Sequence, residues 1–90
     1  MKKRVQLQYG GHVQGVGFRF TSQKVAERTG ITGFVRNLSN GNVEIIGEGD
    51  RFHLEKFIKE LAEHMRGYIS DFHVDWTEPT GEFSSFDIRF

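Results

Sequence analysis

Short runs in which hydrophobic and polar residues alternate predict three of the five β-strands expected in this chain. Alternation of this kind is typical of a strand that buries one face and exposes the other. The Asn-Gly turn within residues 39–42 joins two of the strands into a β-hairpin, because Asn-Gly readily takes positive φ angles. The predicted strands are residues 5–9, 31–38, 43–47, 71–76 and 86–90.

The first of two predicted helices follows a glycine-rich stretch. In the residues after this stretch, hydrophobic positions have helical rather than alternating spacing. The pattern predicts a short helix over residues 21–29, with Val25 and Ala26 on its inner face. We expect Phe18 and Phe20 to pack near its start.

The second predicted helix begins after Asp50, a residue type that caps the first turn of a helix. Its charged face places Glu55 beside Lys59 and Lys56 beside Glu60, pairs worth only about 0.2–0.5 kcal/mol each. Its other face is an apolar stripe made of Leu54, Phe57, Ile58, Leu61, Ala62 and Met65. We therefore expect the helix to pack on the core through the stripe.

The predicted element order is β-α-β-β-α-β, followed by one short C-terminal strand. Two helices that each have one apolar face can cover one side of an antiparallel sheet, which is the ferredoxin-like arrangement of the α+β class. A chain of 90 residues has the length of one domain. We therefore predict a single domain over residues 1–90, with an antiparallel sheet and both helices on one face.

Residues 10–20, between the first strand and the first helix, contain four glycines and Arg19. The backbone N–H groups of such a turn can point at one anion, and the helix dipole favours an anion at that end. An arginine there adds a planar cation that fits two oxygens of a phosphate. The same stretch is compatible with a tight turn and an exposed arginine, so the glycines alone leave both readings open.

Asn37 lies near the end of the second predicted strand, just before the hairpin turn. Asparagine is a common turn residue, and that role alone would explain its position. Its second possible role is to position a water molecule or a substrate oxygen. A neutral amide suits a site that holds a phosphate, because a carboxylate there would repel the anion.

The composition excludes several kinds of site and partner. There is no cysteine, which removes disulfides, thiolate catalysis and cysteine-bound zinc. Twelve basic and twelve acidic residues cancel, so electrostatic capture of nucleic acid or of an anionic membrane is not expected. The basic first residues lead into a strand rather than into the apolar part of a signal peptide. We expect a cytoplasmic protein, and its small size and balanced charge favour a monomer.

Several familiar catalytic motifs are absent. The glycine-rich stretch lacks the third glycine of a dinucleotide fingerprint, no glycine precedes Lys-Ser or Lys-Thr, and no Gly-x-Ser-x-Gly occurs. Glu60 and His64 are one helical turn apart and could touch one metal ion, but no third ligand accompanies them, so no metal site is predicted. Residues 15–20 superficially resemble an RNA-recognition block, which belongs on a third strand and not before a first helix.

Two blocks of sequence resemble the acylphosphatase family. Residues 11–19, Gly-His-Val-Gln-Gly-Val-Gly-Phe-Arg, are similar to the family signature glycine-x-valine-glutamine-glycine-valine-x-phenylalanine-arginine. Residues 33–37, Gly-Phe-Val-Arg-Asn, and residues 41–44, Gly-Asn-Val-Glu, are similar to its second block. The element order and the length also agree, so the resemblance covers essentially the whole chain.

The resemblance implies a ferredoxin-like fold and the hydrolysis of acyl phosphates to a carboxylate and inorganic phosphate, without metal or cofactor. Inorganic phosphate is then a product and a competitive inhibitor. Arg19 matches the arginine that binds the phosphoryl group, and Asn37 matches the asparagine that orients the attacking water. The backbone amides that match the phosphate cradle are those of Gln14, Gly15, Val16, Gly17, Phe18 and Arg19.

The departures from the family pattern are mild and do not touch these residues. Phe34 stands where tryptophan or tyrosine is common, Ser39 and Asn40 stand where an acidic residue often precedes the turn, and residues 67–70 lack a common proline. The main alternative is a non-catalytic anion sensor, or a module that acts on a partner protein. Such a protein needs the same cradle, so the signature does not separate it from an enzyme.

Overall fold

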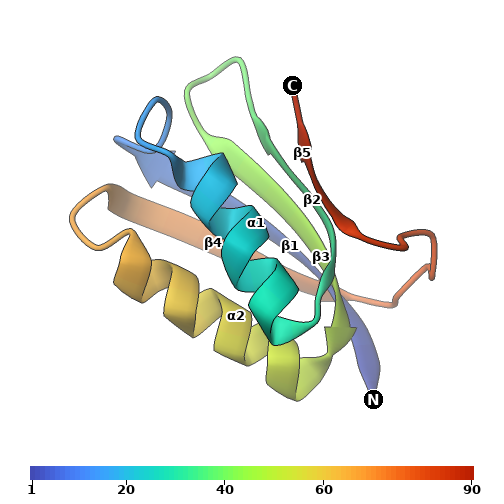
Figure 1. Ribbon diagram of the computed structural model, residues 1–90. Helices are drawn as coiled ribbons and strands as arrows, with labels where there is room; N and C mark the ends of the chain where they lie inside the picture. The colour runs from blue at the N-terminus through green and yellow to red at the C-terminus, as the bar shows by residue number, and fades with distance from the viewer.

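The computed structural model describes all 90 residues as one five-stranded sheet with two helices on one face (Figure 1). The elements are β1 (Lys2–Gly11), α1 (Phe18–Thr29), β2 (Thr32–Asn37), β3 (Val43–Asp50), α2 (Arg51–His64), β4 (Ile69–Thr77) and β5 (Phe86–Arg89). The predicted element order and ferredoxin-like α+β fold are confirmed. Neither helix has the length and apolar character needed to cross a membrane.

The strand order is β4-β1-β3-β2-β5, and one edge of the sheet differs from the prediction. β5 pairs with β2 in parallel, so the sheet is mixed rather than wholly antiparallel. Residues 78–85 carry the chain from β4 at one edge to β2 at the other, and β5 then runs in the direction of β2 (Figure 1). The alternation of Phe86, Ile88 and Phe90 predicted a strand but contained no information about its neighbour.

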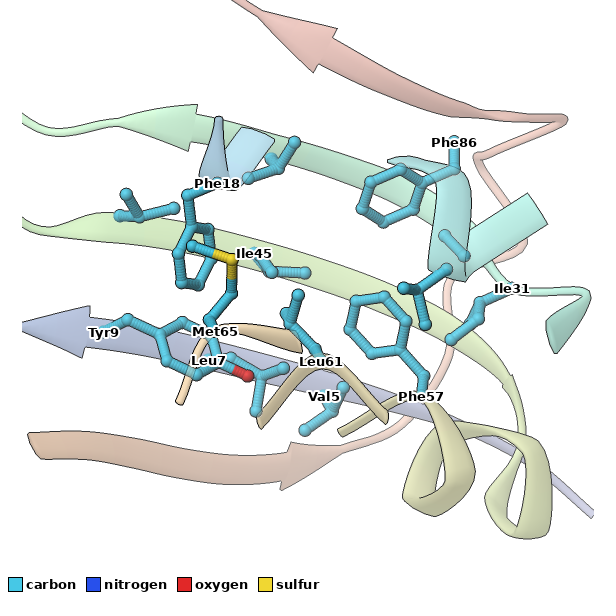
Figure 2. Close-up of a cluster of buried hydrophobic side chains, with 14 of the residues drawn as sticks. Val5, Leu7, Tyr9, Phe18, Ile31, Ile45, Phe57, Leu61, Met65 and Phe86 are labelled. Atoms are coloured by element: carbon cyan, nitrogen blue, oxygen red, sulfur yellow. The ribbon is translucent and has the colours of Figure 1, made fainter. Parts of the chain in front are cut away.

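The hydrophobic core lies between the sheet and the two helices. Val5, Leu7 and Tyr9 of β1 are buried against the helices, as their alternation predicted. Figure 2 shows Phe18 pointing from the start of α1 into this layer, near Tyr9 and Met65. The ring centroids of Phe18 and Tyr9 are 5.0 Å apart. Contacts of this kind between aromatic rings fix the start of α1 over the end of β1.

α1 begins at Phe18, three residues earlier than the predicted Thr21. The N-cap residue is Gly17, which has no side chain, so the polar residue that marks the start of many helices is missing here. Successive helical residues are turned by about 100° from one another. Phe18 is consequently buried. Phe20 is 58% exposed and lies outside the core, contrary to the prediction that it would pack beside Phe18.

α2 follows Asp50 as predicted, but three details differ. Asp50 makes no side-chain cap hydrogen bond; its carboxylate accepts a hydrogen bond from the N-terminal ammonium of Met1 at 2.9 Å instead. Ala62 is exposed, since it lies at the edge of the apolar stripe rather than at its centre. On the charged face an Arg51–Glu55 ion pair forms at 3.3 Å, in place of the two i,i+4 pairs predicted for this helix.

Candidate active site

The loop before α1 and the β2–β3 turn lie at the same end of the sheet, near the C-terminus (Figure 1). A pocket of about 270 Å³ opens there. Four residues predicted to hold a phosphate, Gly15, Gly17, Phe18 and Arg19, line this pocket together with Asn37. Gln14 and Val16 belong to the same loop but do not line the pocket. The fold therefore brings together the two predicted halves of the site, which are far apart in the sequence.

The backbone amides of the loop before α1 have no partner inside the protein. Gly15 and Gly17 both take a left-handed φ of 79°, a conformation that other residues rarely adopt. No N–H group of residues 14–17 donates a hydrogen bond to another backbone group, and Gly17 offers the first turn of α1 no side-chain cap. The loop and the helix start therefore present free donors at the positive end of the helix dipole. No acidic residue occupies the first turn of α1, so nothing there would repel an anion.

Arg19 extends from the first turn of α1 and has no carboxylate partner. Four of the other six arginines do have one, whereas Arg66 and Arg89 do not: ion pairs join Arg4 to Glu48 and Glu82, Arg28 to Glu60, Arg36 to Glu44 and Arg51 to Glu55. The guanidinium of Arg19 instead lies over the ring of Phe90, with its Cζ atom 4.7 Å from the ring centroid. An aromatic ring holds a guanidinium without neutralising its charge, so the N–H groups at its edge stay available to a phosphate.

Asn37 is the last residue of β2 and faces the same side of the sheet as the helices. It pairs in register with Val43, whose side chain is fully buried in the core. Since alternate strand residues share a face, Val35 lies in the core and Asn37 follows it at the rim, where it lines the pocket. No hydrogen bond within the protein occupies its side-chain amide. The amide is therefore free to bind a water molecule or a substrate oxygen.

Two pocket residues that the sequence did not identify are Ile88 of β5 and Phe90, which directly follows that strand. They lie there because β5 runs parallel to β2, with Ile88 beside Val35 in the register. Their alternation with polar neighbours was a signal for one apolar strand face. The missing information was which strand β5 would join.

The side chain of Arg19 is the one charged side chain that lines the pocket, and no aspartate, glutamate or histidine lines it. The pocket can therefore bind an anion through Arg19 and free amides and can orient a neutral molecule through Asn37. It contains no side chain that could act as a general acid or base near neutral pH. The chemistry it favours is one that needs positioning and stabilisation of negative charge rather than proton transfer by the protein.

A second pocket, of about 430 Å³, includes Glu48, but the carboxylate of this residue is fully engaged. Burial alone would raise the pKa of the Glu48 carboxyl, but hydrogen bonds from the Thr80 N–H, the Arg4 guanidinium and the Gly81 N–H lower it to about 2. All of these donors are 2.8–3.0 Å from the carboxylate. Glu48 thus fixes the segment that leads into β5 and is not available as an acid or base.

The pair Glu60 and His64 on α2 faces an arginine of α1. Nη2 of Arg28 is 2.8 Å from a carboxylate oxygen of Glu60 and 3.4 Å from Nε2 of His64. The guanidinium therefore lies where a metal ion shared by these two side chains would need to be.

Comparison with known proteins identifies the family. The acylphosphatase family model matches residues 5–88. An acylphosphatase of Lactobacillus johnsonii is 49% identical over 98% of this chain and 99% of its own. An acylphosphatase of Methanospirillum hungatei is 46% identical over 97% of each chain. The crystal structure of acylphosphatase from Bacillus subtilis superposes on the whole of both chains with a TM-score of 0.91 and 28% identity. The free loop amides, Arg19 and Asn37 thus lie in a protein that belongs to the acylphosphatase family.

Proposed function

We propose that this chain hydrolyses acyl phosphates to a carboxylate and inorganic phosphate, by in-line attack of a water molecule on phosphorus. One observation carries the proposal. A single pocket joins unpaired loop amides, an arginine without a carboxylate partner and an asparagine amide without a partner. The first two suit a phosphoryl group, and the third suits the attacking water.

In this proposal Arg19 and the loop amides hold the phosphoryl oxygens. The amides are those of Gln14, Gly15, Val16, Gly17, Phe18 and Arg19. Phosphoryl transfer passes through a loose transition state, with negative charge spread over the equatorial oxygens. Donors that are already oriented toward these oxygens stabilise the charge without reorganising during the reaction. The free N–H groups of this loop, which turns through two left-handed glycines, are suited to that role.

Asn37 orients the nucleophile in the proposed mechanism. Its amide oxygen accepts a hydrogen bond from a water molecule and so directs a lone pair of the water at phosphorus. The leaving carboxylate lies on the opposite side of phosphorus. A neutral side chain is suitable because a carboxylate at this position would repel the phosphoryl group that Arg19 binds.

The absence of an acid or base among the pocket residues fits the chemistry of an acyl phosphate. The leaving group is a carboxylate whose conjugate acid has a pKa of about 4–5, so it departs without protonation. The water loses its proton to a phosphoryl oxygen of the substrate. An acyl phosphate dianion and water thus give a carboxylate and dihydrogen phosphate, and the protein gains and loses no proton. All of these groups come from one chain, so a monomer is sufficient.

Hydrolysis of benzoyl phosphate tests the proposal. We expect the purified protein to release phosphate well above the uncatalysed rate, with the same rate in the presence of a chelator. Inorganic phosphate should inhibit competitively, because it occupies the same cradle. Binding of phosphate without turnover would instead favour the anion sensor. No binding and no turnover would exclude both functions.

A further inference from the structure

The proposed site has two halves that belong to different parts of the fold. The phosphate-binding half is the loop before α1 and the first turn of that helix, with Arg19. The water-positioning half is Asn37, at the end of β2. In-line attack requires a fixed distance between the halves, and a displacement of about 1 Å can lower the rate by about 10²-fold. Some contact must therefore hold the β2–β3 hairpin against the loop.

The side chain of Gln14 makes this contact. Its amide nitrogen, Nε2, donates hydrogen bonds to the carbonyl oxygens of Leu38 and Asn42, both at 2.8 Å. Leu38 directly follows Asn37, and Asn42 directly precedes β3, so the two bonds span the mouth of the hairpin turn. No other hydrogen bond joins residues 13–17 to this hairpin. The two hydrogen bonds use both amide hydrogens of Gln14, and Gln14 does not line the pocket.

The hairpin that Gln14 holds is itself well ordered. The N–H of Leu38 donates to the carbonyl oxygen of Asn42 at 2.8 Å, which closes the turn. The side-chain amide of Asn42 donates to Oε1 of Gln8 on β1, also at 2.8 Å. Movement of the turn is thus transmitted to Asn37 through one peptide bond. Gln8 fixes the turn to the sheet, and Gln14 fixes it to the phosphate-binding loop.

We propose that the side chain of Gln14 is a positioning residue for the reaction: it holds Asn37 at the distance from the phosphate-binding loop that in-line attack requires. This inference rests on the proposed function. It differs from the role of the Gln14 backbone amide, which would contact the phosphate directly. The side chain touches neither substrate nor water and acts through Leu38 on its neighbour Asn37.

The test compares Gln14→Met with Gln8→Met in benzoyl phosphate hydrolysis. Both substitutions keep the side-chain length and remove hydrogen bonds to the same turn, but only Gln14→Met separates the turn from the loop. We expect Gln14→Met to lower kcat about 10- to 100-fold. We expect its inhibition constant for inorganic phosphate to stay within about twofold, since Arg19 and the loop amides are unchanged. Gln8→Met should leave both values within about twofold of wild type.

A double-mutant cycle with Asn37→Ala distinguishes positioning from a general loss of structure. If Gln14 acts through Asn37, adding Gln14→Met to Asn37→Ala should lower kcat by no more than about twofold further. A further loss as large as in the wild-type background would overturn the inference, and so would an equal loss of phosphate affinity in Gln14→Met. An inactive wild-type protein would refute the proposed function instead. If Gln14→Met does not fold, Gln14→Asn is measured the same way, because its shorter amide cannot reach both carbonyl oxygens.

Discussion

Arg19→Ala is expected to lower kcat for benzoyl phosphate by at least about 10³-fold, to a level at which turnover is no longer measurable. Loss of a single oriented donor at a developing negative charge costs about 10²–10³ in rate. Arg19 can offer two parallel donors and a full positive charge, and its side chain is the one charged side chain that lines the pocket. Nothing else at the site can replace it. Steady-state kinetics with the purified variant measure the effect.

Arg19→Lys is the matched control for charge, and it should fail almost as completely. A lysine keeps the positive charge but cannot reproduce the planar fork that binds two phosphate oxygens. Both variants should stay folded, because Arg19 is not part of the hydrophobic core and its contact with Phe90 is worth only about 0.5–1 kcal/mol. Thermal unfolding checks this point. A lysine variant that kept most of its activity would show that charge alone is sufficient and would contradict the assigned role.

Asn37→Ala is expected to lower kcat by about 10²–10³-fold or somewhat less, with little change in the inhibition constant for inorganic phosphate. The amide is proposed to contact the water and not the phosphoryl group, so its loss affects the transition state and leaves phosphate binding intact. Kinetics and phosphate inhibition, measured on the same preparation, separate the two effects. Loss of phosphate affinity in parallel with the rate would place Asn37 in the phosphate-binding half of the site.

Asn37→Asp is a second control, which adds a negative charge at position 37 instead of removing the polar group. The side chain keeps its size and its ability to accept a hydrogen bond from water, but it gains a negative charge beside the phosphoryl group. We expect phosphate to bind more weakly to this variant than to wild type or to Asn37→Ala. Unchanged phosphate affinity in Asn37→Asp would mean that position 37 lies too far from the phosphoryl group to position an attacking water.

Local patterns in the sequence predicted most of the fold because those patterns have local causes. Val5, Leu7 and Tyr9 alternate because one face of β1 is buried, and that face is the one against the helices. The start of α1 was predicted too late because its N-cap residue is Gly17, which has no side chain to mark the start of a helix. The amides that a side-chain cap would bind belong to the proposed anion site. The departure from the usual rule for helix starts thus falls at the proposed site.

The parts of the site that escaped prediction depend on contacts between distant residues. The left-handed conformation of Gly15 and Gly17 could be predicted from residue type alone, since glycine adopts positive φ angles readily. Ile88 and Phe90 reach the pocket only because β5 pairs with β2, more than fifty residues away in the sequence. The hydrogen bonds of Gln14 span 24 and 28 residues, and no local pattern indicates them.

In the proposed mechanism, water attacks phosphorus rather than the acyl carbon. Hydrolysis of benzoyl phosphate in water enriched in ¹⁸O tests it most directly, with both products analysed by mass spectrometry after a single turnover. Attack on phosphorus, by a water that Asn37 orients toward a phosphoryl group held by Arg19, places the label in inorganic phosphate and leaves benzoate unlabelled. Label found in benzoate would show attack at carbon and would contradict the roles given to both residues.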